Sequence, residues 1–262
     1  MQPLAQMPDA VRRAIRGVLT DIDDTLSTHG RLTAGAYAAM ERLRAAGKLV
    51  IPITGRPAGW CDHIARMWPV DAVVGENGAL WMRYDEGARR LVRGYAVPDA
   101  ERRANRARLA AIGEWIAAAV PGCALASDQL YRETDLAIDF REDVPPLPRA
   151  SVDRIVALME AEGMTAKVSS IHVNGWFGRY DKLAMTRTLL AEAFGIDVDA
   201  ERARFAFVGD SPNDAPMFAF FPNAVGVANV REFADRIATL PAYVTFAEAG
   251  AGFAELAAAL LA

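Results

Sequence analysis

The segment VLTDIDDTLS, residues 18–27, carries an apolar run directly into three aspartates, Asp21, Asp23 and Asp24. Carboxylates this close repel one another and are costly to remove from water, so folding alone does not favour the arrangement. A positive group, such as a metal ion, is therefore expected among them. The preceding run, 15–20, has the continuous hydrophobicity of a strand covered on both faces, which is typical of a parallel sheet.

Further apolar runs end in polar residues in the same way. They are 49–53 before Thr54, 72–74 before Glu76 and Asn77, and 205–208 before Asp210. Helical patterns lie between them, over 33–46, 57–67 and 182–194. Alternating strands and helices predict an α/β fold with an open parallel sheet. Pro52 has no N–H to donate, which argues against a central place for its strand.

Ligands of open α/β sheets bind beyond the carboxyl ends of the strands. Asp21, Thr54, Asn77 and Asp210 all follow predicted strands. We therefore expect them to meet in one crevice, although 189 positions (210 minus 21) separate the first from the last.

The interval between the third and fourth strands has a different pattern. ALWMRYDEGARRLVRGY, residues 79–95, predicts a hairpin that turns at Asp85–Gly87. After it we predict helices over 99–120 and 151–162 and strands over 135–140 and 167–173. We assign residues 95–176 to an inserted α+β domain and residues 1–94 and 177–262 to the core, which closes with a helix over 253–262.

Composition excludes several classes of function. The 262 residues are 24% charged with a net charge of -4, so there is no basic surplus for nucleic acid. The two cysteines, Cys61 and Cys123, are far apart and form no CxxC, which argues against zinc and disulfides and favours a reducing cytoplasm. No apolar stretch reaches the length of a membrane span, and the first residues lack the apolar core of a signal peptide. The oligomeric state is not predicted.

Four short motifs occur in order: DIDDT at 21–25, TGR at 54–56, Lys182 at the start of a predicted helix, and GDSPND at 209–214. Together they resemble the four motifs of the haloacid dehalogenase-like (HAD) hydrolase superfamily over essentially the whole chain. The place of the insertion and GENGAL at 75–80 resemble subfamily IIB, with a type C2B cap. That branch includes sucrose-phosphate and mannosyl-3-phosphoglycerate phosphatases and phosphomannomutases, and YDKL (180–183) and YVTFAEAGAGF (243–253) are closest to its mannosyl-phosphoglycerate side.

The resemblance implies a Rossmann-like core and phosphoryl transfer through an aspartyl phosphate. Asp21 would be the nucleophile, and Asp23 would protonate the leaving oxygen and later activate water. Mg²⁺ is the expected cofactor, held by Asp21, the carbonyl of Asp23 and Asp210, with Asp214 as a direct or supporting ligand. Asp214 has an alternative structural role as the cap of the helix that follows it.

The transferred phosphate would be bound by Thr54, by the backbone at Gly55 and by Lys182. Candidate contacts to the rest of the substrate are Arg56, Asn77, Asn213, Arg132 and Asn174. The three histidines are scattered, so ordinary structural or exposed roles are expected for them.

These features predict a magnesium-dependent phosphatase for a small phosphorylated metabolite, such as a sugar phosphate or a phosphoglycerate derivative. Two alternatives stay open: a phosphomutase of the phosphomannomutase type, and a protein that binds a phosphorylated metabolite without turnover.

Overall fold

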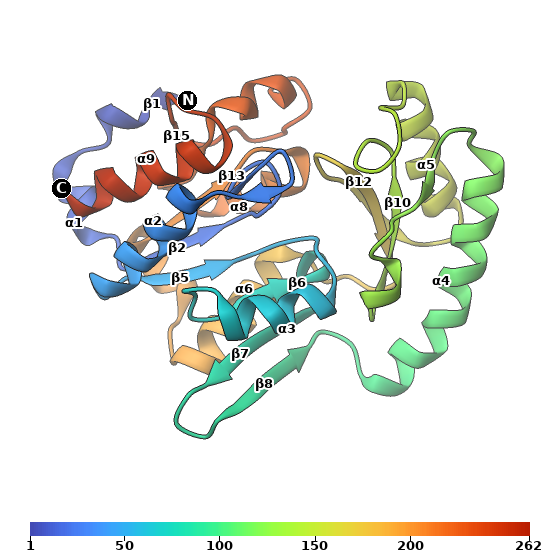
Figure 1. Cartoon of the computed structure of the whole chain (residues 1–262), viewed down its shortest axis with the longest axis horizontal. Coiled ribbons are helices and arrows are strands. Elements are labelled where there is room, and N and C mark those ends of the chain that lie inside the picture. Colours follow the sequence, from blue (N-terminus) through green and yellow to red (C-terminus); the bar gives the residue numbers. More distant parts are fainter.

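The structure, a computed structural model, describes residues 1–262 and consists of a larger and a smaller unit side by side (Figure 1). The larger unit is built on a six-stranded parallel sheet with the order β1-β15-β14-β13-β2-β5. Both chain termini lie in this unit (Figure 1). The strands are β1 Gln2–Pro3, β2 Gly17–Thr20, β5 Leu49–Pro52, β13 Phe205–Gly209, β14 Val225–Gly226 and β15 Tyr243–Val244.

Helices cover both faces of this sheet. Side chains alternate along a strand, so Val18 faces one helical layer and Leu19 the other, and both are fully buried. The Val18 layer contains α1 Asp9–Ala14, α2 Ala34–Ala45, α3 Ala58–Met67 and α9 Ala249–Leu261; the Leu19 layer contains α6 Lys182–Phe194, α7 Val198–Glu201 and α8 Ala215–Phe220. The prediction of an α/β fold with a parallel sheet is thus confirmed.

The strand that contains Pro52 lies at the edge of the six-stranded sheet. Leu49 and Ile53 donate their backbone N–H groups towards β2, so the nitrogen of Pro52 faces away from it. On that side the strand forms no continuous ladder: an isolated bridge pairs Ile53 with Val74, and Val50 exchanges hydrogen bonds with Asp71. A proline is tolerated there because no ladder hydrogen bond is lost.

A three-stranded antiparallel sheet adjoins this edge, formed by β6 Val73–Gly75, β7 Leu80–Asp85 and β8 Arg90–Tyr95. The predicted hairpin is therefore present, with its turn at residues 86–89 rather than 85–87. Asp85 Oδ1 accepts the N–H of Ala88 and stabilises that turn. A short antiparallel pair, β3 Ser27–Thr28 and β4 Arg31–Leu32, follows the three aspartates.

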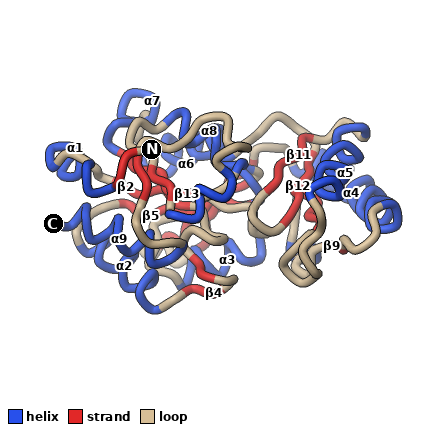
Figure 2. The backbone as a smooth tube through the Cα atoms, turned by 90° about the horizontal axis from the view of Figure 1, so that it is seen from above, coloured by secondary structure: helices blue, strands red, loops and turns tan.

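The smaller unit is an antiparallel sheet with the order β11-β12-β10-β9, covered by two helices. Figure 2 shows these helices on the side of the sheet that faces away from the larger unit. Its elements are α4 Asp99–Ala119, β9 Ala124–Leu125, β10 Asp135–Asp139, α5 Arg149–Ala161, β11 Thr165–Val168 and β12 His172–Trp176. A separate apolar core holds it together, with Ile116, Ile138 and Ile155 among its members. The exact domain boundaries stay a prediction.

The single strand predicted over 167–173 is wrong, because the segment is a hairpin. Ser169 accepts the N–H groups of Ile171 and His172 through its Oγ, and its own N–H donates to the carbonyl of His172. Serine favours such turns because its hydroxyl competes with the strand ladder for backbone groups.

No helix in the structure is both long and apolar enough to cross a lipid bilayer.

Candidate active site

Adjacent parallel strands bring the sequence-predicted residues to one edge of the sheet. Thr20, the last residue of β2, is paired with Val208 of β13, and the N–H of Asp21 donates to the carbonyl of Val208 at 2.8 Å. Asp210 follows β13 directly. The expected convergence of Asp21 and Asp210 is therefore confirmed.

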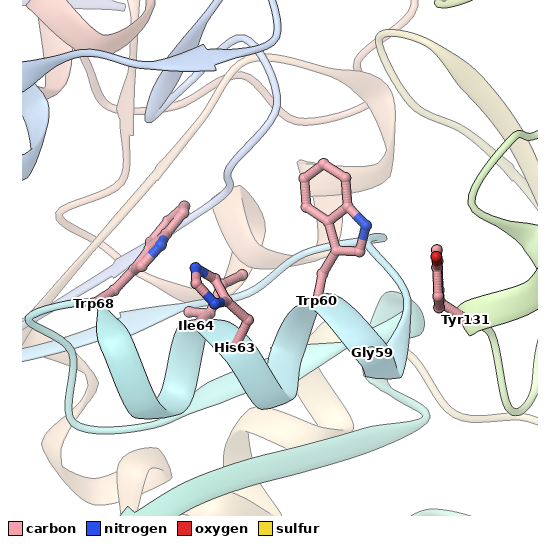
Figure 3. Close-up of a pocket in the computed structure, with 6 residues that line it drawn as sticks. All are labelled: Gly59, Trp60, His63, Ile64, Trp68 and Tyr131. Atoms are coloured by element: carbon pink, nitrogen blue, oxygen red, sulfur yellow. The ribbon is translucent and has the colours of Figure 1, made fainter.

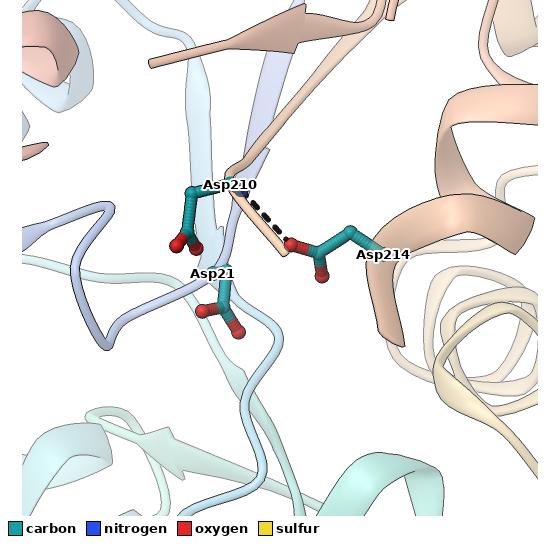
Figure 4. Close-up of side chains that lie close together, drawn as sticks. All are labelled: Asp21, Asp210 and Asp214. Atoms are coloured by element: carbon teal, nitrogen blue, oxygen red, sulfur yellow. Dashed lines mark hydrogen bonds between the residues drawn. The ribbon is translucent and has the colours of Figure 1, made fainter. Parts of the chain in front are cut away.

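Three buried carboxylates lie around one space (Figure 4). Asp21, Asp210 and Asp214 each offer an oxygen, and these oxygens all lie within 4.8 Å of one another. Asp214 accepts the N–H groups of Asp210 at 3.1 Å and of Ser211 at 3.3 Å. Its carboxylate therefore forms a capping box with Ser211 at the 3-10 turn Pro212–Asp214, which leads directly into α8, but it accepts no N–H group of α8 itself.

A lysine inserts its ammonium group between two of these carboxylates. Lys182 begins α6, whose N-cap Asp181 accepts the N–H of Ala184. Its Nζ lies 2.6 Å from Asp21 Oδ1 and 2.7 Å from Asp214 Oδ1, and the side chain is 3% exposed. Three carboxylates with one ammonium leave two formal negative charges (three minus one) in a buried place.

The protonation equilibria reflect this crowding. Burial raises the pKa of Asp21 to about 8, against the lowering effect of Lys182. Burial, together with Asp21 and Asp214, also raises the pKa of Asp210. For Lys182, burial lowers the pKa, but the two neighbouring carboxylates outweigh it and raise the pKa above its ordinary value. An oxygen-rich, negatively charged cluster of this kind fits a hard divalent cation such as Mg²⁺.

Two residues that the sequence analysis missed support the cluster. Thr25 Oγ1 donates to Asp210 Oδ1 at 2.9 Å, and Asn229 Nδ2 lies 3.4 Å from Asp210 Oδ2. The threonine four residues after Asp21 belongs to the DIDDT motif, which was a usable signal. Nothing around Asn229 marks it in the sequence.

A second group of polar residues faces the same space from β5 and the turn after β6. Thr54 is fully buried, and its Oγ1 accepts the N–H of Arg56 at 3.0 Å. Asn77 adopts a left-handed backbone (φ 54°) and is paired through Oδ1 with Asn213 Nδ2 at 3.4 Å. The Nδ2 of Asn77 is buried without a hydrogen-bond partner, and a Cβ at Gly55 would lie 3.0 Å from it. An orphaned buried donor of this kind suits an oxyanion of a ligand.

Asp23 stands apart from the carboxylate cluster. Its side chain accepts three hydrogen bonds from Arg56: Nε to both carboxylate oxygens at 2.9 and 3.1 Å, and Nη2 to Oδ1 at 2.7 Å. Arg56 also contacts Asp128 and Glu142 of the smaller unit. In this conformation Arg56 makes ion pairs in place of its predicted contact with substrate. That the backbone carbonyl of Asp23 ligates a metal stays a prediction.

The remaining substrate-binding candidates lie in the smaller unit. Arg132 is buried and donates to Asp128, Asp135 and the carbonyl of Gly55. The contact with Gly55 joins the two units and the others lie within the smaller unit, so none of them supports the prediction that Arg132 binds substrate. Asn174 donates to Asp135 at 3.0 Å and also lines the space above Asp21.

Glu142 and His172 were not predicted as site residues. His172 Nε2 lies 2.9 Å from Glu142 Oε2, and both belong to the smaller unit. Burial raises the pKa of Glu142, but the close contacts with His172 and Arg56 outweigh it, so the pKa falls to about 2.

The cavity above Asp21 is very small. It measures about 10 Å³, less than a phosphate group needs, and is lined by Asp21, Asp23, Gly55, Arg56, Ser169, Ile171, His172, Asn174 and Asn213. A larger groove of about 430 Å³ runs along one side of α3, lined by Trp60, His63, Ile64 and Trp68, with Tyr131 beside Trp60 (Figure 3). It contains none of the clustered carboxylates, so we assign the chemistry to the small cavity.

Solved structures resemble essentially the whole chain. The C-terminal domain of C. albicans trehalose-6-phosphate phosphatase aligns with a TM-score of 0.70 and 14% identity, over 99% of this chain and 98% of that one. Sucrose-phosphatase from Synechocystis, solved with sucrose and phosphate, aligns with a TM-score of 0.63 and 16% identity, over 95% and 98%. A HAD subclass IIB sugar phosphatase gives 0.58 and 16%, over 88% and 93%.

No family model matches the chain, and no curated protein matches its sequence. At identities below 20% the likeness to solved structures concerns the fold. The expected parallel-sheet core is therefore confirmed, and the chain shares its fold with solved sugar phosphatases and HAD-like hydrolases.

Proposed function

We propose that the chain is a magnesium-dependent phosphatase that hydrolyses a small phosphorylated metabolite, such as a sugar phosphate, through an aspartyl phosphate on Asp21. The observation that carries the proposal is the buried arrangement of Asp21, Asp210 and Asp214 around the ammonium of Lys182. Structural neighbours that are phosphatases for sucrose phosphate and trehalose 6-phosphate support the substrate class.

In the first step a carboxylate oxygen of Asp21 attacks phosphorus, and the bond from phosphorus to the ester oxygen breaks. Asp23, protonated at this stage, gives its proton to that leaving oxygen, so the alcohol departs neutral. In the second step Asp23, now a carboxylate, takes a proton from water, whose oxygen attacks the phosphorus of the aspartyl phosphate. Asp21 is released as a carboxylate and phosphate leaves.

The phosphoryl oxygens need positive partners throughout. Lys182 supplies one beside Asp21, and Thr54, the N–H of Gly55 and the unpaired Nδ2 of Asn77 supply neutral donors. Mg²⁺, held by Asp21 and Asp210 with Asp214, would neutralise the attacking carboxylate and a phosphoryl oxygen. The smaller unit acts in this proposal as a cap that excludes water and contacts the alcohol part of the substrate.

The direct test is a screen of phosphorylated metabolites with measurement of free phosphate, with Mg²⁺ and with a chelator. Wild-type protein should release phosphate only when the metal is present, and Asp21→Asn should release none while keeping the thermal unfolding midpoint of the wild type. Asp24→Asn is a matched control in the same segment. Release that continues in chelator or in Asp21→Asn would contradict the proposal, and an isomeric sugar phosphate without free phosphate would indicate a mutase.

A further inference from the structure

The face of the smaller sheet that is turned toward the larger unit carries a lysine. In β11, Ala166 and Val168 pack against the apolar core of the smaller unit, so Lys167 between them lies on the opposite face of the sheet. Figure 2 shows the helices of this unit on the side away from the larger unit. Lys167 is exposed, and its face is therefore the one that looks toward the active site.

Strand pairing places this lysine beside the small cavity. Lys167 lies directly opposite Asn174 of β12, and directly paired residues stand on the same face with their Cβ atoms about 4.5–5.5 Å apart. Asn174 lines the cavity above Asp21. On its other side, β11 lies beside the turn Pro212–Asp214 of the larger unit, which contributes Asn213 to the same cavity. Lys167 therefore stands at the rim of the candidate active site.

The other cations around the cavity already have acidic partners. Arg56, Arg132 and Lys182 lie 2.7, 2.9 and 2.6 Å from carboxylate oxygens. Lys167 forms no ion pair with any carboxylate of the chain. Its ammonium is a compact charge on a flexible four-carbon stem, so it can turn toward an anion that enters beside Asn174. The rim thus offers a second positive centre, separate from the one that binds the transferred phosphate.

We propose that Lys167 is a specificity-determining residue that binds a carboxylate on the alcohol part of the substrate. The preferred substrate is then the phosphate ester of a hydroxy acid, a sugar acid among them, rather than of a neutral sugar or polyol. The inference rests on the proposed phosphatase function. One ammonium balances the single charge of a carboxylate, whereas a second phosphate would bring almost two charges close to the acidic cluster of Asp21, Asp210 and Asp214.

The first test uses two pairs of substrates that differ only in this group. 2-Phosphoglycerate is compared with glycerol 2-phosphate, and 6-phosphogluconate with sorbitol 6-phosphate, because in each pair the carboxylate is exchanged for CH2OH. In Lys167→Met we expect kcat/KM for the acids to fall about fivefold or more, chiefly through KM, and kcat/KM for the neutral compounds to change less than about twofold. A screen whose best substrates carry no carboxylate would overturn the proposal.

Further variants separate a local contact from a general effect of charge. Arg154→Met is the matched control, since Arg154 is an exposed cation of α5, which covers the opposite face of the sheet. It should leave kcat/KM within about twofold for all four compounds, because exposed charges far apart are screened. Lys167→Arg should keep most of the preference for the acids and Lys167→Glu should abolish it. Equal losses on acids and alcohols, a loss confined to kcat, or the same loss in Arg154→Met would each overturn the proposal.

A binding measurement is independent of turnover. In Asp21→Asn protein with Mg²⁺, calorimetric titration with the two acids should give dissociation constants about fivefold higher when Lys167→Met is added, and unchanged constants for the two alcohols. Unchanged affinity for the acids would overturn the inference. So would a loss of affinity for fructose 1,6-bisphosphate alone, because the anion bound by Lys167 would then be a phosphate. Absence of phosphate release from wild type with every compound of the screen would instead defeat the proposed function, so the two failures are distinguishable.

Discussion

Replacing Lys182 by methionine tests the charge balance of the site. Methionine keeps most of the length of the side chain but leaves Asp21 and Asp214 without the ammonium that lies 2.6 and 2.7 Å from them. Removal of one partner from a buried ion pair costs about 3–5 kcal/mol. Because Asp21 can relieve part of this cost by taking up a proton, we expect the lower value, about 3 kcal/mol, in the metal-free protein at neutral pH.

That loss corresponds to a fall of about 10 °C in the unfolding midpoint for a chain of this size. Mg²⁺ should restore much of it, because a cation at about 100 times its dissociation constant adds about 2.7 kcal/mol of stability. The gain should be larger in Lys182→Met than in wild type, since the variant lacks the ammonium that competes with the metal for the carboxylates. Activity should not return, because the transferred phosphate has lost its positive partner.

The assay is thermal and urea unfolding in chelator and in Mg²⁺, with Lys167→Met on the exposed surface of β11 as the control. The reasoning would be refuted if Lys182→Met unfolded at the wild-type midpoint in chelator. It would also fail if Mg²⁺ stabilised the variant no more than the wild type.

Three further predictions concern single contacts. With its pKa lowered to about 2, Glu142 contributes stability that is present above pH 4.5 and is lost as the pH falls towards 2. After allowance for solvent screening this contribution is about 1 kcal/mol. Between pH 6 and pH 3, the free energy of unfolding measured in urea should therefore decline less in Glu142→Gln than in wild type. Thr25→Val removes the hydrogen bond to Asp210 and should cost about 1–2 kcal/mol in urea unfolding, with weaker Mg²⁺ binding by calorimetry; an unchanged metal affinity would contradict the contact. Gly78 has φ 104°, and a Cβ there would collide with the carbonyl of Asp181. Gly78→Ala should therefore lower the thermal unfolding midpoint clearly, whereas Gly35→Ala, at an exposed glycine with open space around it, should not.

Much of the larger unit follows from local sequence. Strands buried on both faces need uninterrupted apolar runs, and the runs before Asp21 and Asp210 mark two neighbouring central strands. Both ends of α6 also follow from local sequence, because Asp181 is its N-cap and Gly195 adopts the left-handed conformation after its last residue. Because parallel strands end at one edge, the cluster of carboxylates was predictable from the order of the motifs.

Other features depend on contacts that no local pattern records. Strands of two residues, such as β14 and β15, are too short to show a period. The hairpin at Ser169 was missed because its flanking residues are apolar enough to read as one continuous strand. The contacts of Arg56 with Asp128 and Glu142 join segments 72 and 86 positions apart, and only the packing of the two units creates them.

The most direct measurement is a rapid acid quench of the protein during turnover of its best substrate with Mg²⁺, followed by peptide mass mapping. The account predicts phosphate bound covalently to the peptide that contains Asp21, at Asp21 itself, in wild type and none in Asp21→Asn. Turnover without any phosphorylated peptide, or phosphorylation of another residue, would contradict it.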